Sequence, residues 1–183
     1  KLSVIGCGYL GAVHAASMAE LGHEVMGIDV DPRRIASLSK GVAPFHEPGF
    51  NDLLAANQAK LSFATDLSAA QGSRVHFLAV GTPQSADGSV NMTYVNQAVT
   101  DLLPYLSPGD LVVGKSTVPV GTAERLLQMV APTGAHLMWN PEFLREGFAV
   151  QDTLAPDRLV YGVTDDEAGV KDSELLDEVY AAI

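Results

Sequence analysis

The sequence has only one cysteine, Cys7, in 183 residues, so the chain can form no internal disulfide and secretion gains no support. Positive charge is also scarce, because 11 Lys and Arg residues stand against 22 Asp and Glu residues and leave a net charge of −11. A polyphosphate would be repelled by such a chain, so nucleic acid is not an expected partner. No apolar run approaches the roughly 18 residues of a membrane span, and no signal peptide opens the chain. We therefore expect a cytoplasmic protein that does not associate with membranes.

Apolar residues make up 47% of the chain and charged residues 18%, which is typical of a globular domain. The length fits one domain, or one domain and a fragment of another. A small anionic ligand remains compatible with the acidic charge, because helix N-termini bind phosphate without basic side chains. The sequence predicts no metal site, since its five histidines are scattered without the spacing of a ligand set.

Apolar segments that are typical of strands alternate with amphipathic segments that are typical of helices. The expected strands span residues 2–5, 24–28, 61–64, 75–80, 111–113, 136–139 and 159–163. The expected helices span residues 9–21, 48–57, 93–106, 119–130 and 165–183, with a further one beginning at Asp31-Pro32. This order predicts an α/β fold with a mostly parallel sheet and helices on both faces. Ligands of such sheets bind just beyond the carboxyl ends of the strands.

A glycine motif, G-x-G-x-x-G, follows the first expected strand and opens the first helix. Gly6 permits the tight turn, Gly8 lets the backbone approach a pyrophosphate, and Gly11 lets the helix pack close to the strand. Asp29 ends the second strand, where a carboxylate accepts hydrogen bonds from the adenosine ribose and repels a 2′-phosphate. We therefore expect a Rossmann-type doubly wound fold that binds NAD.

Other interpretations of these residues remain open. The glycines could form an ordinary turn, and Arg33 or Arg34 could face the 2′-phosphate of NADP instead. Cys7 lies within the glycine turn, where we expect a packing residue rather than a nucleophile. A short-chain reductase or epimerase is disfavoured, because no tyrosine of this chain has a lysine four residues later.

Several further motifs occur in order along the chain. They are Glu47-Pro48-Gly49, Val80-Gly81-Thr82-Pro83, Lys115-Ser116-Thr117-Val118-Pro119-Val120-Gly121-Thr122, Asn140-Pro141-Glu142-Phe143-Leu144-Arg145-Glu146-Gly147 and Pro156-Asp157-Arg158. With these motifs, residues 2–163 resemble the UDP-glucose/GDP-mannose dehydrogenase family. The Ser-Thr-Val-Pro-Val-Gly form is more similar to the UDP-glucose branch than to the GDP-mannose or UDP-N-acetylhexosamine branches.

The resemblance implies a two-step, four-electron oxidation of a sugar C6 alcohol to a carboxylate, with two NAD+ and a thioester on a cysteine. UDP-glucose is the implied substrate. By the same resemblance, Thr117 helps to hold a water molecule, Glu142 serves proton transfer and thioester hydrolysis, and Glu146 supports the nicotinamide end. The implied NAD contacts are Gly6, Gly8, Tyr9, Leu10, Gly11, Asp29, Arg34, Gly81, Thr82, Ser116, Thr117 and Glu146. The implied sugar contacts are Glu142, Phe143, Leu144 and Arg145.

The residues of the acidic motif also permit a local prediction. Asn140-Pro141 is typical of the N-cap and first position of a short helix, which would place Glu142 and Glu146 on one face with Cβ atoms about 5–6 Å apart. A structural alternative is that Arg145 neutralises Glu142 at i+3 on a solvated face. Ser116 and Thr117 could likewise simply cap a helix that begins at Pro119. We expect Lys115 to be a packing or salt-bridge residue.

The resemblance also implies a domain organisation. Residues 1–183 correspond to an N-terminal NAD-binding domain, with a core sheet over about 1–163 and a closing helix over 164–183. The nucleophilic cysteine with its lysine and asparagine, a central helix and a C-terminal UDP-binding domain would lie outside this chain. We expect the full-length enzyme to be a homo-oligomer and this part alone to be inactive. The apolar face of the closing helix calls for a partner surface. A non-catalytic NAD-binding sensor module is the alternative from another class.

Overall fold

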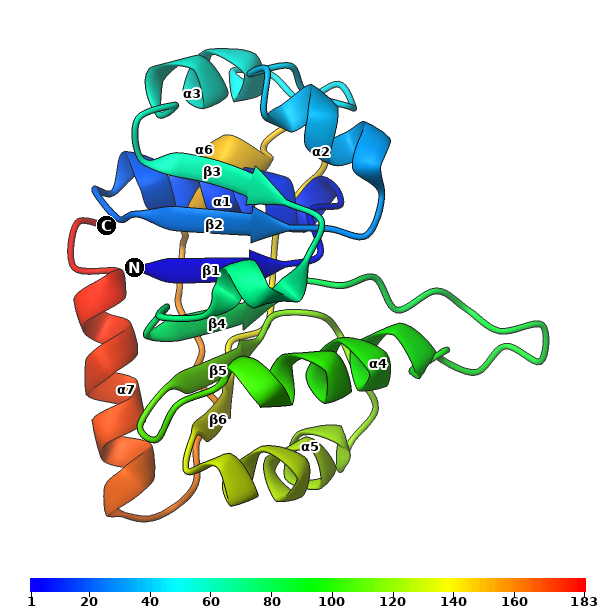
Figure 1. Cartoon of the computed structure of the whole chain (residues 1–183), viewed down its shortest axis with the longest axis vertical. Coiled ribbons are helices and arrows are strands. Elements are labelled where there is room, and N and C mark those ends of the chain that lie inside the picture. The colour runs from blue at the N-terminus through cyan, green and yellow to red at the C-terminus, as the bar shows by residue number, and fades with distance from the viewer.

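Six parallel strands form one sheet in the order β3-β2-β1-β4-β5-β6, as the computed structural model of all 183 residues shows (Figure 1). The strands are β1 (Leu2–Ile5), β2 (Val25–Ile28), β3 (Leu61–Ala64), β4 (Val75–Leu78), β5 (Leu111–Gly114) and β6 (His136–Trp139). β1 and β4 are neighbours in the middle of the sheet, so the strand order reverses beside β1. This is the doubly wound order, in which the reversal creates a crevice at the carboxyl ends of the strands.

Seven α-helices connect or cover the strands. They are α1 (Tyr9–Glu20), α2 (Pro32–Leu38), α3 (Phe50–Ala56), α4 (Thr93–Leu102), α5 (Thr122–Val130), α6 (Ala149–Leu154) and α7 (Glu167–Val179). Three short 3₁₀ turns add to them: η1 (Leu67–Ala70), η2 (Leu103–Tyr105) and η3 (Ala131–Thr133). In Figure 1, α4 and α5 lie in front of the sheet, whereas α1 and α6 lie behind it. The predicted fold class, a Rossmann-type sheet covered on both faces, is confirmed.

Local chemistry explains where several helices begin and end. The carboxylate of Asp31 accepts the Arg33 amide at 2.9 Å, and Pro32 occupies the first turn of α2. Asp166 caps α7 in the same way, by accepting the Gly169 amide at 2.9 Å. Pro104 falls in η2, where α4 tightens and stops.

Two apolar clusters fill the space on either side of the sheet. One joins β-strand residues to α1, α3, α6 and α7, and includes Val13, Met18, Phe77 and Leu176. The other packs the opposite face against α4 and α5. Every residue of β1, β4 and β5 is buried. This burial on both faces of a parallel sheet matches the nearly continuous apolar runs of these strands.

Two of the expected elements outside the candidate site differ from the structure. Residues 159–163 form no strand, because only Gly162 pairs with the sheet, by an isolated antiparallel bridge to Trp139. Leu159, Val160 and Val163 remain exposed, and of the large side chains in this segment only Tyr161 packs against the core. The helix expected from Pro119 begins only at Thr122, since Gly121 at φ +84° occupies its N-cap.

The closing helix is α7, which is shorter at both ends than the expected 165–183. Its apolar face already has a partner surface, because Leu176, Val179 and Tyr180 are buried in the core beside α1. The Nε2 atom of His23, just beyond α1, lies 2.7 Å from the Val179 carbonyl oxygen and ties the two elements together. α7 therefore belongs to this packed unit. None of the helices has both the length and the apolar character needed to cross a bilayer.

Candidate active site

The glycine turn links β1 to α1 and leaves the helix N-terminus open. Gly6 has φ +91°, and a Cβ atom there would lie 2.8 Å from the Val80 backbone. A Cβ on Gly11 would lie 1.8 Å from the Gly6 carbonyl oxygen, so the close approach of helix and turn requires glycine. Around Gly8, by contrast, a Cβ would meet nothing within 4 Å. The backbone is therefore open at Gly8, where a pyrophosphate would approach the amides of the helix N-terminus.

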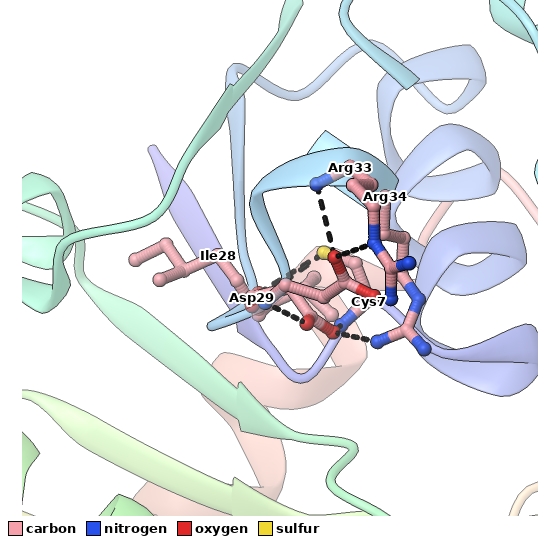
Figure 2. A network of polar contacts seen from close by, with 7 residues as sticks. Cys7, Ile28, Asp29, Arg33 and Arg34 are labelled. Atoms are coloured by element: carbon pink, nitrogen blue, oxygen red, sulfur yellow. Dashed lines mark hydrogen bonds and ion pairs between the residues drawn. The ribbon is translucent and has the colours of Figure 1, made fainter. Parts of the chain in front are cut away.

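Asp29 lies at the end of β2 and faces the glycine turn (Figure 2). Its Oδ2 atom accepts the Cys7 amide at 2.8 Å and Nη1 of Arg34 at 2.7 Å, and its Oδ1 atom accepts the Asp31 amide at 2.9 Å. A carboxylate has about four acceptor sites, so Oδ1 retains one for a ribose hydroxyl. The donors around Asp29 fix the carboxylate in place and leave that one site for a ligand.

Cys7 is a packing residue, as expected. Its side chain is buried, and its Sγ atom lies 3.6 Å from the Ile28 carbonyl oxygen. Burial raises the pKa of the thiol far above its ordinary value, and the Asp29 carboxylate adds to the shift. A thiol held neutral in this way is a poor nucleophile.

A hollow of about 580 Å³ opens beside the turn and is lined by residues of α1, α2 and the segment that follows α2. Its walls include Gly8, Tyr9, Asp31, Arg33, Arg34 and Phe45. The hollow adjoins the N-terminus of α1, and two of its residues, Asp31 and Arg34, bond Asp29, so its position fits the adenosine half of a dinucleotide. Arg33 is exposed and its Nε atom lies 3.4 Å from the Asp31 carboxylate, whereas Arg34 is engaged by Asp29.

The segments that follow β4 and β5 are joined to each other at the same edge of the sheet. The Thr82 hydroxyl donates to the Thr117 carbonyl oxygen at 3.0 Å, and the Ser116 hydroxyl donates to the Val80 carbonyl oxygen at 2.6 Å. Since Gly121 rather than either hydroxyl residue is the N-cap of α5, the capping alternative for Ser116 and Thr117 is wrong. The Thr117 side chain is exposed, so its hydroxyl is free to meet a ligand or a water molecule.

Residues 140–147 form a loop and not the short helix that we expected. The Arg145 amide, which a helix would bond to the Pro141 carbonyl, donates to Asp152 at 3.0 Å instead, and the Phe143 amide donates to the carboxylate of Glu142. Gly147 has φ +84°, which no helical residue adopts. Consequently Glu142 and Glu146 do not share a helix face, and the i+4 geometry predicted for them is wrong.

The alternative pairing of Glu142 with Arg145 is wrong as well. Two guanidinium nitrogens of Arg145, Nε and Nη2, bind Asp152 at 3.0 and 2.7 Å. Glu142 instead lies 3.3 Å from the ammonium group of Lys115. The loop therefore carries two separate ion pairs, one on α6 and one at the end of the sheet.

Lys115 is the centre of a buried polar cluster at the end of β5. Its ammonium group donates to the Oδ1 atom of Asn140 at 3.0 Å, and this oxygen also accepts the Tyr180 hydroxyl at 2.8 Å. Asn140 donates in turn to the Val160 carbonyl oxygen at 3.0 Å, so it is a core bridge and no N-cap. Burial lowers the pKa of Lys115, and the Glu142 carboxylate opposes that shift. The expectation of a salt-bridge residue at Lys115 is confirmed.

Glu47 is the residue of this site that sequence reasoning missed. It is buried in the segment that leads into α3, and it accepts the Tyr9 hydroxyl. It also accepts the Gly147 amide at 3.0 Å and the Ala149 amide at 2.8 Å. The Glu47-Pro48-Gly49 motif was the available signal, but no residue near it in the sequence indicated its partners.

His14 lies beneath the site on α1, where it packs edge-on against Phe77 with ring centroids 4.4 Å apart. It borders a cavity of about 240 Å³ that Lys115, Asn140 and Tyr180 also line. Burial lowers the pKa of His14 well below its ordinary value of 6.5, and the charge of Lys115 lowers it further. His14 is therefore neutral in the folded protein around neutral pH.

This burial predicts a pH-dependent loss of stability. Below pH 6.5 the unfolded chain binds a proton at His14 that the folded chain does not, so the free energy of unfolding falls by up to about 1.4 kcal/mol per pH unit. His14→Phe should remove this contribution. Urea unfolding at pH 7.5 and 5.5 tests the prediction, since the variant should lose about 1 kcal/mol less than the parent. An equal loss in both proteins would show that His14 is not the group responsible.

Comparison with known proteins places this site in a family. Residues 1–183 match the family described as "UDP-glucose/GDP-mannose dehydrogenase family, NAD binding domain". The chain belongs to this family. Its sequence is 40% identical to the UDP-glucose 6-dehydrogenase of Rhizobium meliloti (strain 1021), over 98% of this chain and 43% of that protein.

Solved structures agree with that placement. The GDP-mannose dehydrogenase of Pseudomonas aeruginosa, solved as a ternary complex, superposes with a TM-score of 0.91 at 31% identity, covering 100% of this chain and 44% of that one. A UDP-glucose dehydrogenase from Pyrobaculum islandicum gives a TM-score of 0.89 at 38% identity with the same coverage. The chain thus spans about two fifths of the length of the relatives that it matches.

Membership of the family confirms the predicted cofactor, NAD, and gives a frame for the predicted site residues. The structure brings the glycine turn, Asp29, Arg34, Thr82 and Thr117 to one edge of the sheet. It also places Glu146 beside Tyr9, whose pKa its charge helps to raise. Arg145 was predicted to contact the sugar, but its guanidinium is already bound by Asp152. The individual roles of these residues stay predictions.

Proposed function

We propose that this chain is the cofactor-binding part of an NAD-dependent nucleotide-sugar 6-dehydrogenase, with UDP-glucose as its substrate. One observation carries the proposal: Gly147, next to Glu146, donates its amide to the Tyr9 hydroxyl at 3.1 Å, so the acidic loop is bonded to the first residue of α1. Glu146 thus lies close to the start of α1, where the turn would hold the cofactor, and Glu142 lies at the other end of the same loop beside Lys115. A module that only senses NAD has no need of acids there.

The residues at the sheet edge fit NAD and favour it over NADP. Bound NAD+ supplies the hydride acceptor of the reaction. The open backbone at Gly8 and the N-terminus of α1 would bind the pyrophosphate, and Oδ1 of Asp29 would accept one ribose hydroxyl. Because Asp29 is a fixed carboxylate at this position, a 2′-phosphate would meet its negative charge.

Oxidation of an alcohol also requires a group that takes the hydroxyl proton. Glu142 is suited to this task, since its side chain is one fifth exposed and its Oε1 and Oε2 atoms are fixed by the Phe143 amide and by Lys115. Thr117 has an exposed hydroxyl that would orient a water molecule for later hydrolysis. Glu146 would border the nicotinamide end of the cofactor. Phe143, Leu144 and Arg145 complete the loop that would touch the sugar.

The remaining steps need residues that the longer relatives would provide. We propose that a cysteine, a lysine and an asparagine from a second domain complete the conversion to UDP-glucuronate. A central helix and a C-terminal UDP-binding domain would belong to the same complete enzyme. We also propose that the complete enzyme is a cytoplasmic homo-oligomer. The single thiol of this chain is buried, which suits a reducing compartment.

The decisive experiment is an NAD+ reduction assay on the complete polypeptide that contains this chain. We expect two NADH for each UDP-glucose consumed, and a loss of at least about 10²-fold in kcat for Glu142→Gln. Glu174→Gln, on the exposed face of α7, is the matched control and should retain activity. Turnover of GDP-mannose or a UDP-N-acetylhexosamine in place of UDP-glucose would correct the substrate. NAD+ binding without turnover of any nucleotide sugar would favour a sensor module.

A further inference from the structure

Glu47 joins three parts of the molecule that are far apart in sequence. The Tyr9 hydroxyl reaches it from the start of α1, and two amides reach it from the end of the acidic loop and the start of α6. Its residue is only 5% exposed. The carboxylate is thus a buried acceptor that converging donors surround, and the proposed reaction gives it no role.

We propose that Glu47 is a positioning residue that couples the cofactor turn to the acidic loop, so that NAD+ bound at Gly8 and Tyr9 holds the loop in its working position. The inference rests on the proposed function, since it concerns the same cofactor and the same acids. It goes further by assigning a link between the two halves of the site. Glu47 itself does not line the hollow beside Gly8.

Tyr9 is the element that connects the cofactor to Glu47. Its ring lines the hollow beside Gly8 and packs against Phe45, with ring centroids 4.9 Å apart. Its hydroxyl donates to Glu47. A dinucleotide lying over Gly8 and this ring would restrict Tyr9, and a restricted Tyr9 would restrict the carboxylate behind it.

Burial raises the pKa of the Tyr9 hydroxyl, and the hydrogen bond to Glu47 raises it further. The hydroxyl therefore keeps its proton and remains a donor around neutral pH. At the opposite end of the link, Glu47 holds Gly147 and Ala149, the residues that immediately follow Glu146 and begin α6. A displacement of Glu47 would free these amides and with them the end of the loop.

The donor pattern requires a carboxylate and not merely a polar side chain. All three partners of Glu47 donate, and a carboxylate presents acceptors only. In Glu47→Gln one oxygen becomes an NH₂ group, and in either orientation this group would face a backbone amide, Gly147 or Ala149, that can only donate. The substitution keeps the volume of the side chain, so it removes the link with little change in packing.

Hydrogen exchange of the 183-residue chain with and without NAD+ tests the coupling. In the parent chain, saturating NAD+ should slow exchange at the Gly147 and Ala149 amides about fivefold, at the lower end of typical coupling between sites. In Glu47→Gln this NAD+-dependent slowing should disappear, while the amides of α1 next to Gly11 still report bound NAD+. Glu174→Gln, which makes the same chemical change on an exposed face, should behave as the parent.

Tyr9→Phe keeps the proposal testable if Glu47→Gln does not fold. It removes only the hydroxyl, so Glu47 still accepts the Gly147 and Ala149 amides. Without NAD+, these amides should therefore exchange as slowly as in the parent chain. At an NAD+ concentration that saturates this variant, NAD+ should cause no further slowing of exchange at the Gly147 and Ala149 amides. NAD+-dependent slowing that persists in a folded Glu47→Gln or in Tyr9→Phe would overturn the inference. Failure of the parent chain to bind NAD+ would instead count against the proposed function.

Discussion

Gly11→Ala should destabilise the domain by about 3 kcal/mol, the upper part of the usual range for overpacking, and should abolish NAD+ binding. The added Cβ would lie 1.8 Å from the Gly6 carbonyl oxygen, and no side-chain rotation can relieve a clash with backbone. The turn and α1 would have to separate, which would deform the site at its most constrained point.

Gly8→Ala provides the matched comparison. Its Cβ would meet nothing within 4 Å, and Gly8 has φ −64°, so stability should change by less than about 0.5 kcal/mol. The methyl group would nevertheless stand where the pyrophosphate approaches, and NAD+ affinity should fall at least about tenfold. Thermal unfolding and calorimetric titration of both variants separate the two effects. Equal loss of stability in both would contradict the packing assigned to Gly11.

Lys115→Met should lower the free energy of unfolding by about 3 kcal/mol, because breaking a buried ion pair strands its partners. Asn140 would lose a donor to its Oδ1 atom, and the half-buried Glu142 would lose its counter-charge. The value lies at the lower end of the range for buried pairs, since Glu142 keeps some contact with water. In the complete enzyme, the same variant should also reduce turnover, because the side chain of Glu142 would no longer be held.

Two controls show whether the lost free energy of unfolding comes from the broken ion pair or from the loss of a lysine as such. Lys171→Met removes an exposed i,i+4 pair with Glu167 and should cost no more than about 0.5 kcal/mol. The double variant Lys115→Met, Glu142→Gln should cost less than the sum of its single variants by about 1 kcal/mol. Urea unfolding measures all of these. Strict additivity would show that the two charged groups do not interact as the structure indicates.

Much of the fold could be predicted because alternation and glycine chemistry are local. β1, β3 and β6 have the bounds that their apolar runs predict, and Asp31-Pro32 opens a helix as expected. The failures came where tertiary contacts outweigh local preference. Residues 140–147 have a helix-opening sequence, but side chains from α6 and from Glu47 capture their amides. Residues 159–163 are mostly apolar, yet only Gly162 pairs with the sheet.

The candidate site could be predicted only where a residue lies next to its strand. Asp29 follows the end of β2 directly and Thr117 lies three residues beyond the end of β5, so the topology alone brings them to one edge. Glu47 could not be placed, because its partners are 38, 100 and 102 residues away in the sequence. The partners of Asn140 were missed for the same reason, since Tyr180 and Val160 reach it from beyond the loop.

The central claim is that one edge of the sheet holds NAD+ with its redox ring beside the acidic loop. A crystal structure of this chain with NAD+ tests the claim most directly. We predict the pyrophosphate over Gly8, one ribose hydroxyl on Oδ1 of Asp29, and the nicotinamide ring between Thr117 and Glu146. A dinucleotide bound away from Gly8, or one whose nicotinamide points away from the loop that carries Glu142, would contradict it.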